Sequence, residues 1–298
     1  MSETATDKAL IAFAGMGVMG APMAGHLARA GHSVRVYNRS PQKALDWASA
    51  HSGTVADTLA ALAEGASVLV LCVGNDDDVR QIVTEALPHL APGAVIIDHT
   101  TTSAAVAREL AERAATTGRV FLDAPVSGGQ AGAVNGTLSV MVGGDAGAVE
   151  AVRPLLAAYA KAVAYMGPSG SGQLTKMANQ IAIAGVVQGL AEAMHFSRSA
   201  GLDPATVYDA ISKGAAQSWQ MDNRWATMAE DRYDFGFAVD WMRKDLGLVL
   251  DEARHNGAHL GLTALVDQFY SEVQAMGGSR WDTSSLAARL EARRRNRD

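Results

Sequence analysis

The first half of the chain alternates short apolar runs with segments of helical character, and this pattern constrains the fold most strongly. The apolar runs, several of them rich in Val and Ile, span 8–15, 32–38, 67–74, 93–99, 118–124 and 137–144. Helical patterns lie between them at 18–30, 41–50, 76–87, 103–116 and 146–158. Continuous apolar strands that alternate with helices are typical of a parallel sheet covered on both faces. We therefore expect a doubly wound α/β domain.

The pattern changes after "YMGPSGSG" (165–172), and from 173 to 293 no segment reads convincingly as a strand. Residues 173–201 form one helical pattern that is apolar almost all round, so we expect this helix to be buried or shared with a second subunit. Further helical patterns follow at 204–213, 219–230, 238–256, 262–276 and 283–295. The expected organisation is a nucleotide-binding domain over 1–168 and an all-helical domain over 169–298, joined by the long helix.

Composition excludes several classes of function. The chain has 298 residues, a net charge of −6 and 48% hydrophobic residues, which argues for a globular protein without a nucleic-acid partner. No uninterrupted apolar run reaches the roughly 18 residues that a membrane span needs. The first eight residues are polar and carry no apolar segment of a secretory signal. We expect a cytoplasmic location. The single cysteine, Cys72, cannot form an internal disulfide.

A glycine-rich turn follows the first apolar run. "IAFAGMGVMGAPM" contains Gly15-x-Gly17-x-x-Gly20 between an expected strand and an expected helix, which is the context that a Rossmann-type dinucleotide site requires. Gly15 makes the tight turn, Gly17 admits the diphosphate to the backbone, and Gly20 lets helix and strand pack closely. The diphosphate then lies on the helix N-terminus, where free N–H groups favour an anion. The predicted cofactor-binding residues here are Gly15, Gly17, Val18, Met19 and Gly20.

The end of the second expected strand indicates which nicotinamide cofactor is used. An NAD site usually shows Asp or Glu about 20 residues after the glycines, whereas this chain has Asn38, Arg39 and Ser40. Arg39 can pair with a 2′-phosphate and Ser40 can add a hydroxyl donor. We therefore predict NADP(H) in preference to NAD(H). The alternative is that Arg39 is only a surface charge and that both cofactors are used.

Six glycines gather in "DAPVSGGQAGAVNGTLSVMVGG" (123–144). Such a cluster indicates strained turns or a backbone that a ligand approaches closely. The segment runs off the end of an expected strand, where ligands bind in open α/β sheets. The N–H groups after Ser127, at Gly128 and Gly129, are not covered by side chains. They can receive a small carboxylate, with the Ser127 hydroxyl as a further donor.

Lys176 lies near the start of the long apolar helix. An amine there is costly unless it extends to solvent or has a chemical role. Burial lowers the pKa of a lysine, which suits it to exchange a proton with a substrate hydroxyl. Asn179 and Gln180 lie one turn on, on the same face, and either amide can hold the substrate. From these residues alone, a structural lysine and a catalytic one stay equally open.

These segments together resemble the β-hydroxyacid dehydrogenase family, which includes 3-hydroxyisobutyrate dehydrogenases, tartronate semialdehyde reductases and glyoxylate/succinic semialdehyde reductases. The similarity covers nearly the whole chain. It is carried, in the right order, by "AGMGVMGAPMAGHLARAGHSVRVYNRS", "DAPVSGGQAGAVNGTLSVMVGG", "GPSGSGQLTKMANQ" and "FAVDWMRKDLGLVLDEA". The resemblance implies a hydride transfer between NADP(H) and a small β-hydroxy acid or its semialdehyde, with a lysine as general acid/base.

The resemblance also implies roles for individual residues. Lys176 would be the general acid/base, and Ser127, Gly128 and Gly129 would bind the substrate carboxylate. The remaining implied contacts, with substrate or cofactor in the cleft between the two domains, are Thr101, Phe237, Val73, Gly74, Lys244 and Asp245. Family members assemble as homodimers or homotetramers, and the same is expected here. One departure is that many members have Asn four residues after the lysine, where this chain has Gln180.

Two alternatives to this function stay open. Trp219, Met221, Trp225, Trp241 and Met242 either form core or subunit packing, or shape a pocket for an imine or a bulkier ketone. A more remote alternative is an NADP-binding scaffold without catalysis. No "HExxH" or "CxxC" occurs and the eight histidines are scattered, so we expect no metal.

Overall fold

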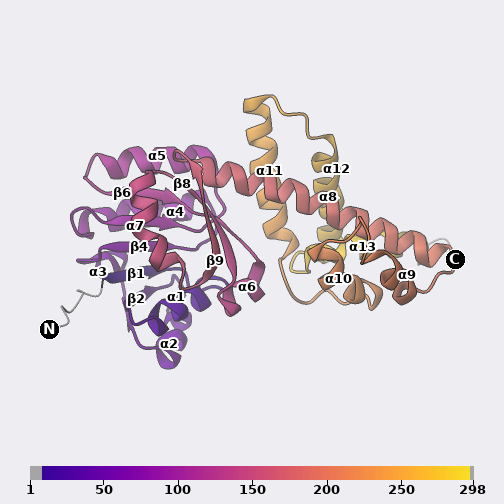
Figure 1. The fold of residues 1–298 in the computed structure, drawn as a ribbon, viewed down its shortest axis with the longest axis horizontal. Coiled ribbons are helices and arrows are strands. Elements are labelled where there is room, and N and C mark those ends of the chain that lie inside the picture. The colour runs from indigo at the N-terminus through magenta and orange to yellow at the C-terminus, as the bar shows by residue number, and fades with distance from the viewer. Residues whose placement is uncertain (1–8, 296–298) are drawn as a thin grey trace. The chain divides into compact units, whose positions relative to one another are not determined.

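The computed structural model describes residues 9–295, so the polar segment 1–8 lies outside the described residues. The chain divides into two compact units, 1–176 and 177–298. Figure 1 traces both units along the chain. Among the described residues, no helix is long and apolar enough to cross a membrane.

The first unit is built on one nine-stranded sheet with the order β3-β2-β1-β4-β5-β6-β8-β7, and β9 pairs with β8. The strands are β1 (Leu10–Ala14), β2 (Ser33–Tyr37), β3 (Thr54–Val55), β4 (Val68–Leu71), β5 (Val95–Asp98), β6 (Val120–Asp123), β7 (Val126–Ser127), β8 (Leu138–Gly143) and β9 (Ala160–Gly167). The strands from β3 to β6 are all parallel to their neighbours. β8 runs antiparallel to β6 and β7, which departs from the expected purely parallel sheet.

The strand order reverses between β1 and β4. The chain moves from β1 outward to β2 and β3, and then returns to the other side of β1 with β4. At such a reversal, the loops after the two strands leave in opposite directions and open a crevice at the carboxyl ends of the strands. The expected doubly wound fold is confirmed, and its reversal point lies at the glycine-rich turn after β1.

Helices cover both faces of this sheet. They are α1 (Gly20–Arg29), α2 (Pro41–Ala50), α3 (Leu59–Ala63), α4 (Asp76–Ala86), α5 (Ala104–Ala115), α6 (Gly129–Asn135) and α7 (Ala146–Leu156), with a 3-10 turn η1 (Leu87–His89). Several begin at a side-chain cap that accepts a backbone N–H, namely Thr58, Asn75, Ser103 and Asp145.

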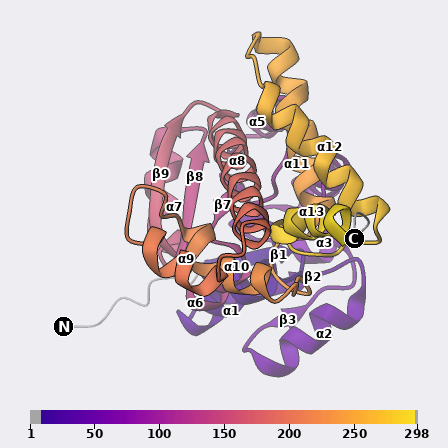
Figure 2. The same ribbon diagram turned by 90° about the vertical axis from the view of Figure 1, so that its right-hand side faces the viewer.

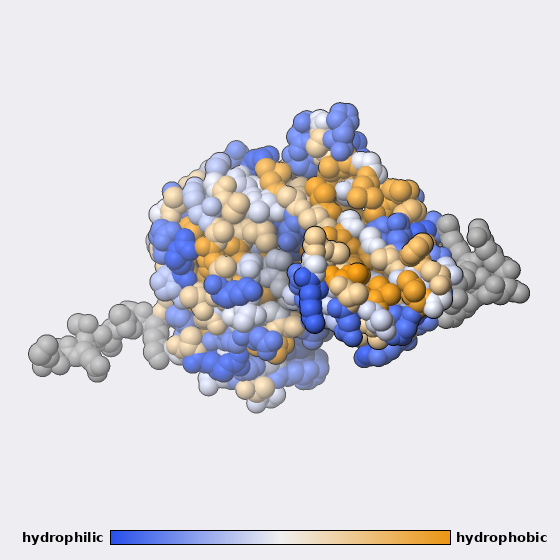
Figure 3. Space-filling model, turned by 45° about the vertical axis from the view of Figure 1, so that its right-hand side comes forward, coloured by the Kyte–Doolittle hydropathy of each residue, from blue (hydrophilic) through white to orange (hydrophobic). Residues whose placement is uncertain are grey.

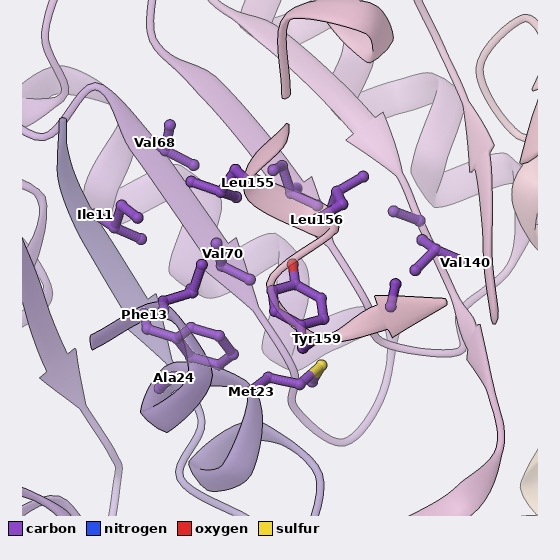
Figure 4. Close-up of a cluster of buried hydrophobic side chains, with 14 of the residues drawn as sticks. Ile11, Phe13, Met23, Ala24, Val68, Val70, Val140, Leu155, Leu156 and Tyr159 are labelled. Atoms are coloured by element: carbon purple, nitrogen blue, oxygen red, sulfur yellow. The ribbon is translucent and has the colours of Figure 1, made fainter. Parts of the chain in front are cut away.

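Alternate residues of the central strands point into two separate cores. Ile11 and Phe13 of β1 pack with residues of α1 and α7, such as Met23 and Leu156, on one face (Figure 4). On the other face, Ala12 and Ala14 of the same strand pack with residues of α3, α4 and α5. This two-residue period explains why the strands read as continuously apolar, since both of their faces are buried.

The second unit is helical throughout its described residues. α8 (Ser171–Ser199) begins in the first unit and continues into the second. It is followed by α9 (Pro204–Ile211), α10 (Trp219–Ala229), α11 (Val239–Asn256), α12 (Gly261–Ala275), the 3-10 turn η2 (Thr283–Ser285) and α13 (Leu286–Arg295). α11 and α12 lie side by side (Figure 2), and Arg243 of α11 pairs with Asp267 of α12 at 3.0 Å.

Five short or irregular elements were not expected: β3, α3, β7, α6 and β9. β9 (AKAVAYMG) has mostly exposed side chains, and its alanines with a single Val lack the Val and Ile content that marks the expected strands. Cys72 lies just past β4 and is half-buried.

Candidate functional site

The glycine-rich turn joins β1 to α1 with little space around two of its glycines. Gly15 has φ +103°, a conformation that favours glycine, and its N–H donates to Tyr37 O at 2.9 Å. A Cβ at Gly15 would overlap the carbonyl of Cys72, and a Cβ at Gly20 would overlap the carbonyl of Gly15. A Cβ at Gly17 would meet nothing within 4 Å. The space beside Gly17 therefore remains for a ligand, as a diphosphate cradle requires.

The residues after β2 have different tasks. Asn38 Oδ1 accepts the N–H of Met16 at 2.9 Å, and its amide donates to Ser40 O, so Asn38 fixes the glycine-rich turn. Ser40 is the N-cap residue of α2. The Arg39 side chain is 87% exposed and pairs with Asp78 at 3.3 Å. Arg39 is therefore a cation at the rim of the turn that an added anion can reach.

The loops after β4 and β5 are joined by hydrogen bonds. Thr100 Oγ1 accepts the N–H of Val73 at 3.0 Å, and the N–H of Thr100 donates to Asp98 Oδ1 at 2.9 Å. Thr100 and Thr102 are buried, whereas Thr101 between them is half-buried. The structure thus brings the predicted residues Val73, Gly74 and Thr101 to one edge of the sheet, beside the glycine-rich turn.

His99 directly follows β5, and both nitrogens of its buried ring make hydrogen bonds. Its Nδ1 lies 2.6 Å from Ala124 O and its Nε2 lies 2.8 Å from the Tyr159 hydroxyl. Burial lowers the pKa of His99 to about 4, although the hydrogen bond to Ala124 opposes the shift. The ring is therefore neutral near pH 7. Because a carbonyl can only accept, Nδ1 carries the proton and Tyr159 donates to Nε2.

The segment from Ser127 to Gly129 turns sharply at the end of β7. Gly128 has φ +127° and Gly129 has φ +61°, so both positions favour glycine. A Cβ at Gly129 would meet nothing within 4 Å, while one at Gly128 would lie 3.2 Å from Leu138. The glycines here serve both tight backbone geometry and an open space next to Ser127.

Lys176 lies in the second turn of α8 and is 8% exposed. The first turn of α8 is tied to the ends of β5 and β6. The Asp123 carboxylate accepts the N–H groups of Gly170 at 2.8 Å and Gln173 at 2.9 Å. The Gln173 side chain donates to Thr100 O at 2.7 Å and accepts from Thr102 N at 3.1 Å. The helix that carries Lys176 therefore starts at the carboxyl edge of the sheet.

The two amides after Lys176 differ in their surroundings. Gln180 is 2% exposed, and its Nε2 donates to Asp245 Oδ2 at 2.7 Å while its Oε1 accepts from Asn179 at 2.8 Å. Asp245 also pairs with Lys244 at 3.2 Å. Asn179 is only half-buried. Both ends of the Gln180 amide are thus bound within the protein, and Asn179 is the more accessible of the two.

The remaining candidates lie in the helical unit. Phe237 is 37% exposed, and its backbone N–H donates to Asp282 at 3.0 Å. Five large residues were expected either to pack in the core or to shape a pocket. Of these, Met221, Trp225 and Met242 belong to the hydrophobic core. Trp219 and Trp241 are exposed. Among the described residues, no group of three or more His, Cys, Asp or Glu side chains is placed to hold a metal ion.

Sequence reasoning missed four residues of this site: His99, Thr100, Asp123 and Gln173. Asp123 belongs to the glycine-rich motif at 123–144, and Gln173 belongs to "GPSGSGQLTKMANQ". The spacing of these residues in the sequence does not indicate which groups they bond. The only available signal was that a carboxylate and an amide directly at strand and helix ends tend to satisfy backbone groups.

Comparison with known families assigns both units. A model of the NAD binding domain of 6-phosphogluconate dehydrogenase matches residues 10–167. A second model, described as the NAD-binding region of NADP-dependent 3-hydroxyisobutyrate dehydrogenase, matches residues 170–290. The first match alone covers more than half of the chain.

Individual relatives agree. An uncharacterized oxidoreductase of Shewanella frigidimarina is 60% identical over 289 residues, covering 96% of this chain and 99% of the relative. The 2-hydroxy-3-oxopropionate reductase of Escherichia coli is 33% identical, covering 94% and 97%. The structure of Mycobacterium tuberculosis 3-hydroxyisobutyrate dehydrogenase with L-serine matches with a TM-score of 0.86 and 32% identity, covering 95% and 99%.

The chain belongs to the β-hydroxyacid dehydrogenase family. It is an NAD(P)-dependent oxidoreductase that acts on CH–OH groups. Membership confirms the resemblance and the two-part architecture of a doubly wound domain followed by helices.

The two glycines of the turn give a matched pair of variants. Gly20→Ala forces a methyl group onto the Gly15 carbonyl, so we expect unfolding free energy to fall by about 3 kcal/mol. Gly17→Ala fits the free fold and should change stability by less than about 1 kcal/mol. It should weaken dinucleotide binding by about tenfold or more, since the methyl occupies the cradle. Urea unfolding and cofactor titration measure the two effects; equal stability losses would contradict this account.

Proposed function

We propose that this chain transfers a hydride between NADP(H) and a small β-hydroxy acid or its semialdehyde, with Lys176 as general acid/base. One observation carries the proposal. Lys176 is nearly buried on a helix whose first turn is hydrogen-bonded to the ends of β5 and β6. Ligands of open α/β sheets bind at this edge, so the amine is held where substrate and nicotinamide would meet.

The chemistry follows from the amine. Lys176 Nζ takes the proton of the substrate hydroxyl during oxidation and returns a proton to the nascent alkoxide during reduction. Its ammonium form places a positive charge beside the developing oxyanion, so the proton transfer needs no metal. A bound nicotinamide supplies or accepts the hydride. We assign the substrate carboxylate to Ser127 and the N–H groups of Gly128 and Gly129.

Support for NADP(H) comes from the rim of the glycine-rich turn. No carboxylate follows β2, and exposed Arg39 stands where a 2′-phosphate would lie. The second matching family model also describes an NADP-dependent enzyme. Arg39 and Ser40 would bind the phosphate, while Asn38 supports the turn. We assign cofactor contacts also to Val18, Met19, Val73, Gly74, Thr101 and Lys244.

Between the two amides, we propose that Asn179 contacts the substrate. Gln180 is bound at both ends to Asn179 and Asp245, whereas Asn179 is half-buried and lies three residues after Lys176 on the same helix face. Asp245 then holds Gln180 in place. Phe237, partly exposed at the start of α11, is proposed as a side of the substrate pocket.

We also propose that two copies of this chain associate through α8. Ala182, Val186, Gly189 and Phe196 lie on one side of this helix and are all exposed, Val186 at 38% and Phe196 at 69%. Hydrophobic residues also gather on the face that Figure 3 displays. These residues form an apolar stripe that exposed Glu192 borders, and an exposed apolar stripe of this length is typical of an interface. A second copy supplies a matching apolar stripe by symmetry.

The activity is tested by a paired screen on the purified protein. Oxidation is assayed with NADP⁺ or NAD⁺ on 3-hydroxyisobutyrate, L-serine and glycerate, and reduction with NADPH or NADH on the semialdehydes of tartronate and succinate and on glyoxylate. We expect turnover of a small acid, faster with the phosphorylated cofactor. Lys176→Met should lower kcat by about 10²–10⁴-fold, the usual contribution of a general acid/base.

A measurement of NADPH binding distinguishes the different reasons for a negative result in this screen. NADPH affinity should be unchanged in Lys176→Met, which shows that the variant is folded. Full turnover in Lys176→Met would overturn the role of the lysine. Turnover of cyclic imines alone, with every hydroxy acid and aldehyde inert, would replace the proposed substrate class. NADPH binding without turnover of any substrate would favour a scaffold.

Kinetic and stability measurements distinguish the roles of the Asn179 and Gln180 amides. Asn179→Ala should lower kcat/KM for the acid by about 10–100-fold, the loss of one hydrogen bond to a charged or reacting group, with little change in unfolding free energy. Gln180→Ala removes the partner of a buried carboxylate and should cost about 1–3 kcal/mol of stability. The reverse pattern, a stable Gln180→Ala without turnover and an active Asn179→Ala, would assign the substrate contact to Gln180.

Association through α8 predicts a particle of at least twice the protomer mass in sedimentation equilibrium. Phe196→Glu and Val186→Glu place a charge on the proposed interface and should shift the protein toward monomer. Leu45→Glu, at an exposed position of α2, is the matched control and should not. A wild-type monomer at micromolar concentration, or variants that associate as the wild type does, would exclude this interface.

A further inference from the structure

The first turn of α8 holds a buried amide that makes two backbone contacts outside its helix. Gln173 is fully buried, its Nε2 donates to Thr100 O at 2.7 Å, and its Oε1 accepts from Thr102 N at 3.1 Å. A carbonyl only accepts and an N–H only donates, so these two bonds fix which way the amide points. Gln173 therefore attaches α8 to the two residues that flank Thr101.

The same turn is held from a second side by Asp123. Its two carboxylate oxygens accept the N–H groups of Gly170 and Gln173. A carboxylate at a helix N-terminus satisfies backbone donors that have no partner within the helix. The close approach needs glycine at 172, because a Cβ there would lie 2.9 Å from Asp123 Oδ2. Side chain and backbone of Gln173 are thus both anchored.

The bonds continue from Gln173 to the neighbouring loop. Thr100, whose carbonyl Gln173 binds, also accepts the N–H of Val73 through its hydroxyl. Lys176 lies three residues after Gln173, so the two side chains leave α8 on the same face. Any change in the rotation or rise of this turn moves Lys176 relative to Thr101 and Val73.

We propose that Gln173 is a positioning residue for Lys176, which it holds in register with the Thr101 segment, with Asp123 as the second anchor. The inference rests on the proposed role of Lys176 as general acid/base. Positioning matters because proton transfer needs a hydrogen-bond geometry between amine and hydroxyl, and a displacement of about 1 Å can cost about 10²-fold in rate.

The test replaces the amide by a side chain of similar length without hydrogen bonds. Gln173→Met should lower kcat by about 10–100-fold, while the Kd for NADPH, read by fluorescence, stays within about twofold of wild type. Gln188→Met is the matched control: Gln188 is also a buried glutamine of α8, but its amide bonds only to Glu192 of the same helix. Its kcat should be unchanged.

A second variant covers the case in which Gln173→Met does not fold. Gln173→Glu keeps the shape and the acceptor for Thr102, and loses the donor to Thr100. It should lower kcat by about tenfold or more, again with NADPH affinity retained. The proposal is overturned if either folded variant keeps wild-type kcat, or if kcat and NADPH affinity fall together as in a general loss of structure.

Lys176→Met, measured in the same series, separates this inference from the proposed function. If turnover survives Lys176→Met, the assignment of the lysine is wrong, whatever the Gln173 variants show. If turnover is lost in Lys176→Met but retained in Gln173→Met, only the positioning role falls.

Discussion

The arrangement of the candidate site depends on the hydrogen bonds that backbone N–H groups at the first turn of α8 donate to the Asp123 carboxylate. Burial raises the pKa of Asp123 above its usual range, while the backbone N–H groups of Gly170, Gln173 and Gly172 favour the charged form. A buried carboxylate is costly unless it is fully hydrogen-bonded. Here the helix terminus supplies the donors, so the carboxylate and the helix end each satisfy the other.

This contact also explains much of the glycine-rich segment. A Cβ at Gly143 would lie 2.6 Å from Asp123 Oδ1 and 2.8 Å from the N of Gly172, so only glycine leaves room for the helix terminus. Gly128, Gly129, Gly136 and Gly144 adopt positive φ values instead. The cluster therefore has two purposes, close approach of α8 and tight turns, besides the open space beside Gly129 that a carboxylate can use.

The fold was predictable from the sequence where a strand is buried on both faces, because such a strand is apolar at successive positions. β1 and β4 are apolar at every position because each face meets its own core, and α2 begins at Pro41, a signal that is local. β9 was missed because it is rich in Ala and has only one β-branched residue, and β7 because two residues cannot show a period. The antiparallel direction of β8 depends on its pairing with β6 and β7, which the apolar pattern of a single strand does not encode.

For the site, glycine spacing predicted the turn at Gly15–Gly20, because that requirement is steric and local. The proposed choice of Asn179 over Gln180 was not accessible from the sequence, since it rests on Asp245, 65 positions away, whose carboxylate accepts a hydrogen bond from the Gln180 amide. The same applies to Gln173, whose partners Thr100 and Thr102 lie 73 and 71 positions away. Hydrogen bonds between distant segments decide which of several adjacent polar residues remains available to a ligand.

Electrostatics at the rim of the glycine-rich turn limits how strongly the site can select its cofactor. α4 begins with three acidic residues, Asp76, Asp77 and Asp78. Asp76 accepts hydrogen bonds from Ser103, and Asp77 pairs with Arg80. Asp78 remains beside Arg39. An exposed pair of this kind contributes about 0–1 kcal/mol, so a dianionic 2′-phosphate, which Arg39 can bind with two hydrogen bonds, displaces the carboxylate at little cost. Asp78 still repels that phosphate, so the proposed preference for NADP(H) would rest on the difference between two opposing charges and would be weaker in high salt.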